Sequence, residues 1–157
     1  MFTLHSVENH RIIETFRRAA DRNQSTIDAN NLVAHVSEFQ GCPVLKIDKP
    51  HWHNRGEVDI PGEIFFSIWV GTVSRINYNI HALKLRHLTA YRLQSRDFAT
   101  AFRASFNPAG WPNISTDFGP QTLMQGWIPD DGNLDELIVK FVETHQLIDE
   151  LLKEKMK

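Results

Sequence analysis

A run of seven residues, Ile64 to Val70, constrains the fold of this chain more than any other segment. It reads Ile-Phe-Phe-Ser-Ile-Trp-Val, so aromatic and β-branched residues predominate and one serine is polar. Such residues favour extended backbone, and a strand that is apolar on both faces has to be covered on both sides. The sequence therefore predicts a central strand of a sheet at residues 64–70.

Further strands are predicted on either side of this run. Residues 76–88 predict a second long strand, because apolar and polar side chains alternate along its first half. The alternation shifts after Ala82, which indicates a bulge or a change to helix. Shorter strands are predicted at 44–47 and 122–128, and Gly71 to Arg75 predicts a turn.

Helical periodicity predicts three helices around these strands. Residues 7–23 form an amphipathic pattern, and residues 96–106 place three phenylalanines one turn apart, with Ser95 as the expected N-cap. A capping box at Asn133 opens the clearest helix, which runs to near the C-terminus. Its apolar stripe consists of Leu134, Leu137, Ile138, Phe141, His145, Ile148, Leu151 and Leu152.

Residues 25–41 allow two interpretations. Apolar residues at 32, 33, 36 and 39 fit a helix that starts at Ser25 or Thr26 and ends at Gly41 in the left-handed conformation. The alternative is that 32–39 is an edge strand. The helix is our prediction.

The order of these elements predicts an α+β fold in a single domain, residues 1–157. We expect a mostly antiparallel sheet of about four to five strands, flanked by N-terminal helices, a short helix 96–106 and a long C-terminal helix. Cys42 is the only cysteine, so no intramolecular disulfide can form, and its neighbours predict a buried position. No apolar run is long enough to span a bilayer, and the N-terminal residues lack a signal peptide's apolar core. We therefore expect a cytoplasmic protein without a membrane contact.

The charge of the chain is concentrated between residues 75 and 103. The whole chain has a formal net charge of −2, yet this segment holds six bases against the single acid Asp97. The six are Arg75, Lys84, Arg86, Arg92, Arg96 and Arg103. Lys and Arg supply affinity for phosphates, so we expect a non-enzymatic interaction module that binds a polyanion such as nucleic acid, or a protein partner. The alternative is that these bases pair with acids of the C-terminal helix.

The segment 108–128 predicts a different class of function. Trp111, Phe118 and Trp127 stand among short polar residues, a combination that lines small-molecule pockets. A small-molecule-binding protein or an enzyme is therefore the second hypothesis. The competing interpretation is a loop that folds onto the domain.

A metal site is the third hypothesis. His51 and His53 would point to the same side of an extended segment, and Glu57 follows four residues later. Solvated or hydrogen-bonded histidines in a loop explain the same residues. No Gly-rich phosphate loop or nucleophile elbow occurs, so the sequence defines neither a reaction nor a cofactor.

The C-terminal helix predicts self-association. Its stripe continues through Ile148, Leu151 and Leu152, and we expect this end to extend past the core of the domain. Such a helix would pack on a second copy or on another protein. The alternative is a helix that lies across the sheet of its own domain.

Overall fold

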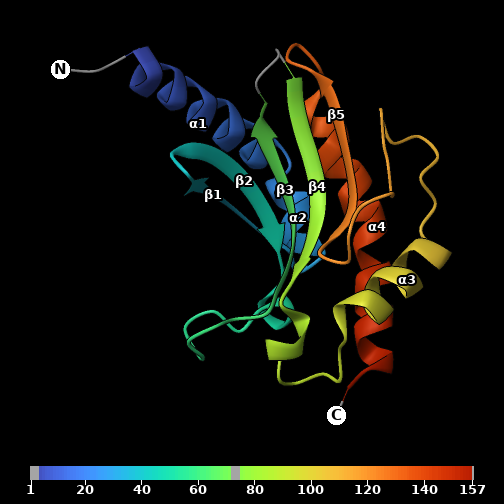
Figure 1. The fold of residues 1–157 in the computed structure, drawn as a ribbon. Coiled ribbons are helices and arrows are strands. Elements are labelled where there is room, and N and C mark those ends of the chain that lie inside the picture. The colour runs from blue at the N-terminus through green and yellow to red at the C-terminus, as the bar shows by residue number, and fades with distance from the viewer. Residues whose placement is uncertain (1–3, 72–74, 157) are drawn as a thin grey trace.

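The computed structural model describes residues 4–71 and 75–156, without the side chains of residues 4–7. Two helices come first, followed by four strands, a helix, a fifth strand and a last helix (Figure 1). The elements are α1 Leu4–Arg22, α2 Gln24–Ala29, β1 Val33–Phe39, β2 Cys42–Asp48, β3 Glu63–Val70, β4 Arg75–Leu83, α3 Ser95–Ser105, β5 Thr122–Pro129 and α4 Leu134–Glu154. The predicted α+β class is confirmed.

The strands form one antiparallel sheet in the order β1-β2-β3-β4-β5. Each strand therefore pairs with its neighbour in the sequence, and β3 occupies the middle. This confirms the prediction of a central strand at residues 64–70. Ile64, Phe66 and Ile68 are fully buried on one face of β3.

The helix predicted for residues 25–41 is wrong beyond Ala29, and the edge-strand alternative is correct. Asn31 adopts a positive φ of 59° and ends the helical segment. Phe39 then pairs with Cys42 across the loop Gln40-Gly41, whose φ values of 52° and 79° are those of a type I′ hairpin turn. Gly41 therefore lies in a hairpin turn and does not end a helix. The backbone hydrogen bonds along the whole of β2 stabilise the strand, and the helical spacing of the apolar residues does not decide the structure.

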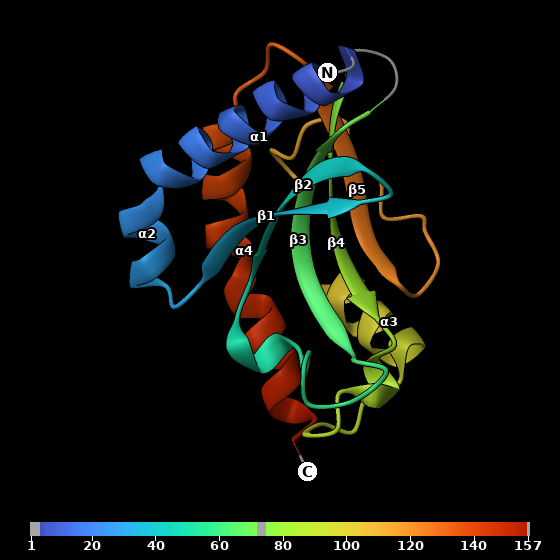
Figure 2. The same cartoon turned by 90° about the vertical axis from the view of Figure 1, so that its left-hand side faces the viewer.

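Helices α1 and α4 cover one face of the sheet. Phe16 and Ala19 of α1 belong to the same core cluster as Phe66 and as Phe141 of α4. In Figure 2, α4 lies behind β2 and beside β3, and α1 crosses the β1–β2 hairpin (Figures 1 and 2). α3 packs against α4 beside β5, with Phe98, Phe102 and Phe106 all buried as predicted.

β4 is shorter than predicted because the chain changes to helix. Lys84 is in the left-handed conformation, with φ 49° and ψ 47°, and the 3-10 turn Leu85–His87 follows. This change accounts for the shift in alternation after Ala82. The turn predicted for 71–75 lies partly outside the described residues.

Two expectations about exposure are wrong. The stripe of α4 does not extend past the core, since Ile148, Leu151 and Leu152 are at most 8% exposed within the single chain. The apolar face that suggested a dimer through α4 is therefore used inside the domain. Cys42 is exposed, because it follows the hairpin turn at the edge of the sheet. The N-cap of α3 is Gln94 in place of Ser95.

Candidate ligand-binding face of the sheet

The second face of the sheet is the best candidate for a functional site. The core cluster takes every other residue of the central strands, so the remaining side chains point to the opposite face. No described helix lies across that face between the β1–β2 hairpin and residues 53–62 (Figures 1 and 2). We call it the open face.

A row of polar side chains crosses the open face on all five strands. Successive strand pairings place its members directly opposite one another, so they share one face. This polar row consists of His35, Lys46, Ser67, Asn79 and Gln125. His35, Lys46 and Gln125 of this row are partly exposed, whereas Ser67 and Asn79 at its centre are buried.

The middle of the polar row is a buried hydrogen-bonded chain. Ser67 and Asn79 are 3% and 1% exposed, and the Ser67 hydroxyl donates to Oδ1 of Asn79. Nδ2 of Asn79 lies 2.7 Å from Nε2 of His81, whose Nδ1 lies 3.2 Å from the carbonyl oxygen of Gln121. A carbonyl oxygen only accepts, so Nδ1 carries the proton and Nε2 accepts from the amide. Both nitrogens of His81 are thereby engaged.

The neutral form of His81 is favoured by its surroundings. Burial lowers the pKa of His81, the charge of Lys46 lowers it further, and the hydrogen bond to Gln121 acts in the opposite direction. A neutral ring with both nitrogens engaged is fixed in orientation and has no free site for proton transfer. His81 is therefore held as a hydrogen-bonded ring beside Asn79.

Lys46 supplies a positive charge at the polar row of the open face. Its Nζ lies 4.3 Å from the ring centroid of Phe65, and the Phe65 ring lies 5.4 Å from that of His81. A lysine above an aromatic face gains a cation–π interaction and keeps its donors free. Within the described part of the chain, no carboxylate forms an ion pair with Lys46.

Arg55, in the segment that precedes β3, differs from Lys46 because its guanidinium pairs with two carboxylates. Its Nη2 donates to Asp48 at 2.9 Å and its Nη1 to Glu63 at 2.6 Å. Burial acts to raise the pKa of Asp48, but hydrogen bonds from His35 and Arg55, together with their charges, outweigh it and lower that pKa. The carboxylates near the open face are thus committed to Arg55 and His35.

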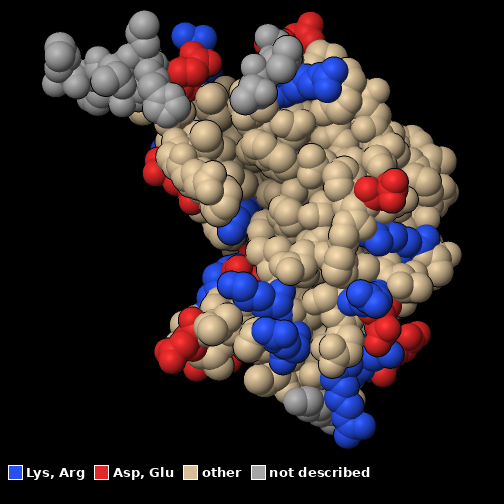
Figure 3. All heavy atoms as spheres, in the orientation of Figure 1, with Lys and Arg blue, Asp and Glu red and all other residues tan. Residues whose placement is uncertain are grey.

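The open face is recessed in the molecular surface. Figure 3 shows the outline indented between the β1–β2 hairpin and the segment that precedes β3. Lys and Arg atoms are visible inside this indentation, and more of them gather over the lower half of the same side. A ligand that entered there would meet positive charge on its way to the polar row.

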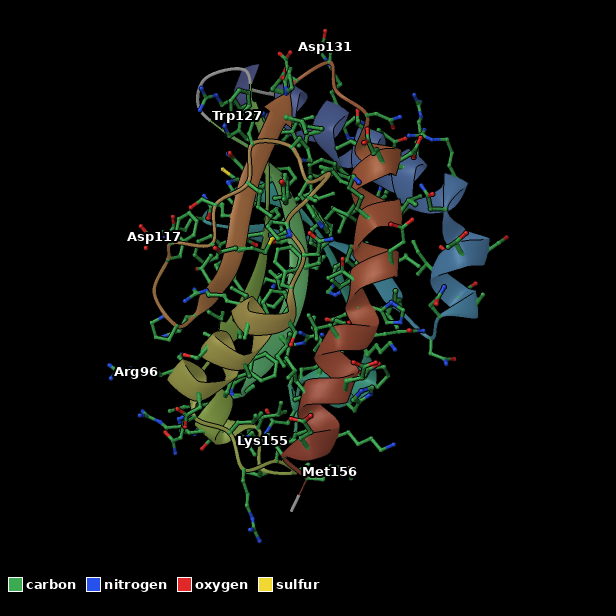
Figure 4. The ribbon with its side chains drawn as sticks, turned by 90° about the vertical axis from the view of Figure 1, so that its right-hand side faces the viewer. Arg96, Asp117, Trp127, Asp131, Lys155 and Met156 are labelled. Carbon is green, nitrogen blue, oxygen red and sulfur yellow. The ribbon has the colours of Figure 1, made fainter. Side chains whose placement is uncertain are left out.

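The structure divides the six bases predicted to form one surface. Arg75 lies 3.8 Å from the ring centroid of Trp127, and Figure 4 shows Trp127 near the top of the molecule and Arg96 in its lower half. Arg103 is used internally, since its guanidinium donates to the carbonyl oxygens of Phe118, Gly119, Thr122 and Leu123. The other four, Lys84, Arg86, Arg92 and Arg96, are exposed, as Arg75 is. No ion pair between the described residues joins any of the six to an acid of α4.

The three aromatic residues predicted to line a pocket do not converge. Trp111 is 8% exposed and packs in the core against Phe66 and Tyr78. The Tyr78 hydroxyl donates to the carbonyl oxygen of Pro112 at 2.6 Å and fixes this loop. Trp127 belongs to the open face with Arg75 on it, and Phe118 is exposed. The loop therefore folds onto the domain, as the competing interpretation had it.

The predicted metal ligands are also not brought together. Nε2 of His51 lies 2.6 Å from Asp149 of α4, whereas Nδ1 of His53 accepts from the backbone N–H of Arg55. Glu57 is exposed. Among the described residues, no group of three or more His, Cys, Asp or Glu side chains is placed to hold a metal ion.

Sequence reasoning assigned no site role to His35, Lys46, Ser67 or Gln125. The available signal was the single polar residue within an otherwise apolar strand, as Ser67 is within β3. Such a residue marks the position where a buried face carries a hydrogen bond.

No protein-family model matches the chain, and comparisons with curated proteins and with solved structures give no significant match. Within the described residues, none of the helices is both long and apolar enough to cross a membrane.

Proposed function

We propose that the protein binds a small anionic molecule on the open face of the sheet. The observation that carries this proposal is Lys46, a positive charge without a carboxylate partner among the described residues, beside a preordered polar row. Charge-assisted hydrogen bonds from an ammonium group are among the strongest that a binding site can offer.

The neighbouring side chains define the rest of the ligand. His35, on the strand beside Lys46, is partly exposed and can exchange hydrogen bonds with polar groups of the ligand. Trp69 lies two residues from Ser67, on the same face of β3. It is also partly exposed and offers a ring for stacking. A molecule with one anionic group and a planar, polar ring fits this combination.

Adenosine monophosphate is a suitable probe because it combines a phosphate with a planar base. We expect it to shift the amide resonances of β2, β3 and β4, and we expect Lys46→Ala to weaken its binding about tenfold to a hundredfold. Titration calorimetry and two-dimensional NMR measure both effects. Lys46→Arg should retain most of the affinity, because it keeps the charge.

Two controls separate this site from general attraction of anions. Adenosine has the same ring without the phosphate and should bind much more weakly. Lys84→Ala removes an exposed base outside the open face and should leave the affinity unchanged. Equal effects of Lys46→Ala and Lys84→Ala would contradict the proposal, as would the absence of any resonance shift on the open face.

A second function, the binding of nucleic acid, is favoured by a separate observation. Lys84, Arg86, Arg92 and Arg96 are exposed, and the backbone N–H of Arg92 donates to the carbonyl oxygen of Lys155 at 2.7 Å. The C-terminal end of α4 is therefore beside them, and Lys and Arg atoms gather over this half of the molecule (Figure 3). Phosphates are attracted to such a concentration of charge.

Arg86→Ala combined with Arg96→Ala tests nucleic-acid binding. We expect a labelled single-stranded oligonucleotide to bind the native protein at low salt, with an affinity that falls as salt rises. Removing two phosphate contacts should reduce the slope of log affinity against log salt by about 1.4. Fluorescence anisotropy measures both quantities, and Arg11→Ala, on the exposed surface of α1, is the matched control. A slope that both variants leave unchanged would exclude this surface.

A further inference from the structure

The two edges of the sheet differ in the hydrogen bonding of their outward-facing backbone groups. At the β5 edge, Gln125 exchanges backbone hydrogen bonds of 2.8 and 3.0 Å with Ser115, and the side chain of Asn113 donates to the carbonyl oxygen of Trp127. At the β1 edge, the described residues make no backbone hydrogen bond outside the pairing with β2. An uncovered edge strand is a template for pairing with another chain.

The hairpin turn determines which backbone groups of β1 are free. Phe39 and Cys42 close a two-residue type I′ loop, so they form a hydrogen-bonded pair. Hydrogen-bonded pairs recur at every second residue, which directs Val33, His35 and Ser37 toward β2 as well. The N–H and C=O groups of Ala34, Val36 and Glu38 therefore point away from the sheet.

The exposed apolar side chains of β1 are arranged symmetrically about Val36. Val33 is 47% exposed and Phe39 is 67% exposed, and both point to the open face. If β1 paired antiparallel with an identical strand about Val36, each Phe39 would lie opposite Val33 of the second copy. These would be non-hydrogen-bonded pairs, in which the side chains of antiparallel strands approach most closely.

The other side of β1 faces α1. The same register places Glu38 opposite Ala34 of the second copy, on the face toward α1. A surface hollow of about 350 Å³ lies there between α1 and β1, with Arg17 and Ala34 among the residues that line it. Glu38 is exposed and would face this hollow, where Arg17, which also pairs with Glu14 at 3.7 Å, lies beside Asp21.

We propose that a second copy of this chain pairs with β1, antiparallel and centred on Val36, so that the two sheets become continuous. The free backbone groups and the apolar pair both agree with this one register. The surface differs from the α4 surface that the sequence suggested.

Light scattering and sedimentation over a range of concentrations test the proposal. We expect the native protein to form dimers as its concentration rises. The double variant Val33→Lys with Phe39→Lys places like charges opposite each other and should raise the dissociation constant at least tenfold. The double variant Val33→Lys with Phe39→Asp places opposite charges together in the same register and should restore association.

The rescue distinguishes this register from a general loss of apolar surface. Far-UV circular dichroism and thermal melting of the monomers confirm that both variants fold, which is expected because the substituted side chains are exposed. A native protein that is monomeric at all concentrations would overturn the proposal. So would a dimer that the two lysines do not weaken, or a failure of the aspartate variant to associate.

Discussion

Replacing Phe66 by alanine is expected to lower the free energy of unfolding by about 3–5 kcal/mol. Phe66 is fully buried at the centre of β3, and its ring stacks on that of Phe141 with a centroid distance of 4.5 Å and an interplanar angle of 6°. Trp111 packs edge-on against it at 6.2 Å. Removal of the ring would leave a cavity where the sheet, α4 and the loop 107–121 meet.

Chemical denaturation followed by tryptophan fluorescence measures this loss. Phe118→Ala is the matched control, because it removes the same side chain from an exposed position. We expect its effect to be less than half as large. Comparable losses for the two variants would show that the contact between β3 and α4 is not the centre of the core.

Asp149→Ala is expected to lower the free energy of unfolding by about 3 kcal/mol. Asp149 accepts three hydrogen bonds: from Nζ of Lys49 at 2.6 Å, from Nε2 of His51 at 2.6 Å and from Nε1 of Trp52 at 2.8 Å. The side chain of Lys49 is only 8% exposed. Without the carboxylate, this buried ammonium group would lose its partner, and the segment 49–52 would lose its attachment to α4.

Denaturation midpoints of Asp149→Ala and of the neighbouring control Glu150→Ala measure the effect. Glu150 is exposed on the same helix, so the control removes a charge without removing a buried contact. Asp149→Asn keeps an acceptor and should lose less than the alanine variant. Equal stabilities of the two alanine variants would contradict this account of the cluster.

The contribution of Asp149 should also depend on pH in a defined direction. Burial acts to raise its pKa, but the hydrogen bonds from Lys49, Trp52 and His51 outweigh it and hold the pKa below the ordinary value of 3.8. A depressed carboxyl pKa gives stability that is fully present above the unfolded value and is lost as the pH falls through the folded one. The difference between native protein and Asp149→Ala should therefore stay constant near neutral pH and shrink only in strong acid.

The sequence predicted the strands and helices well where the pattern was long. β3 and α4 were located within a residue or two, because an apolar run and a repeated helical stripe each specify one structure. Residues 32–39 were assigned wrongly because the apolar spacing of a short segment fits helix and strand alike. The hydrogen bonds with β2, which depend on residues later in the chain, decide the outcome.

The candidate site was harder to predict, for a physical reason. The basic residues of 75–103 were conspicuous in the sequence, but the left-handed turn at Lys84 directs the chain away from β4, and Arg103 is used to hold a loop. The polar row, in contrast, takes one residue from each strand. Its members are far apart in the sequence, and only the strand register brings them together.

The order of the strands has a consequence for how the chain acquires its structure during synthesis. Because each strand pairs with the one before it, the sheet can grow from β1 to β4 in sequence order, whereas β5 joins β4 only across residues 84–121, which contain α3. The helix that covers the core face, α4, comes after all five strands. Until residues 134–154 have left the ribosome, the apolar face around Phe66 lacks its cover, and this is the interval in which a chaperone would bind the nascent chain.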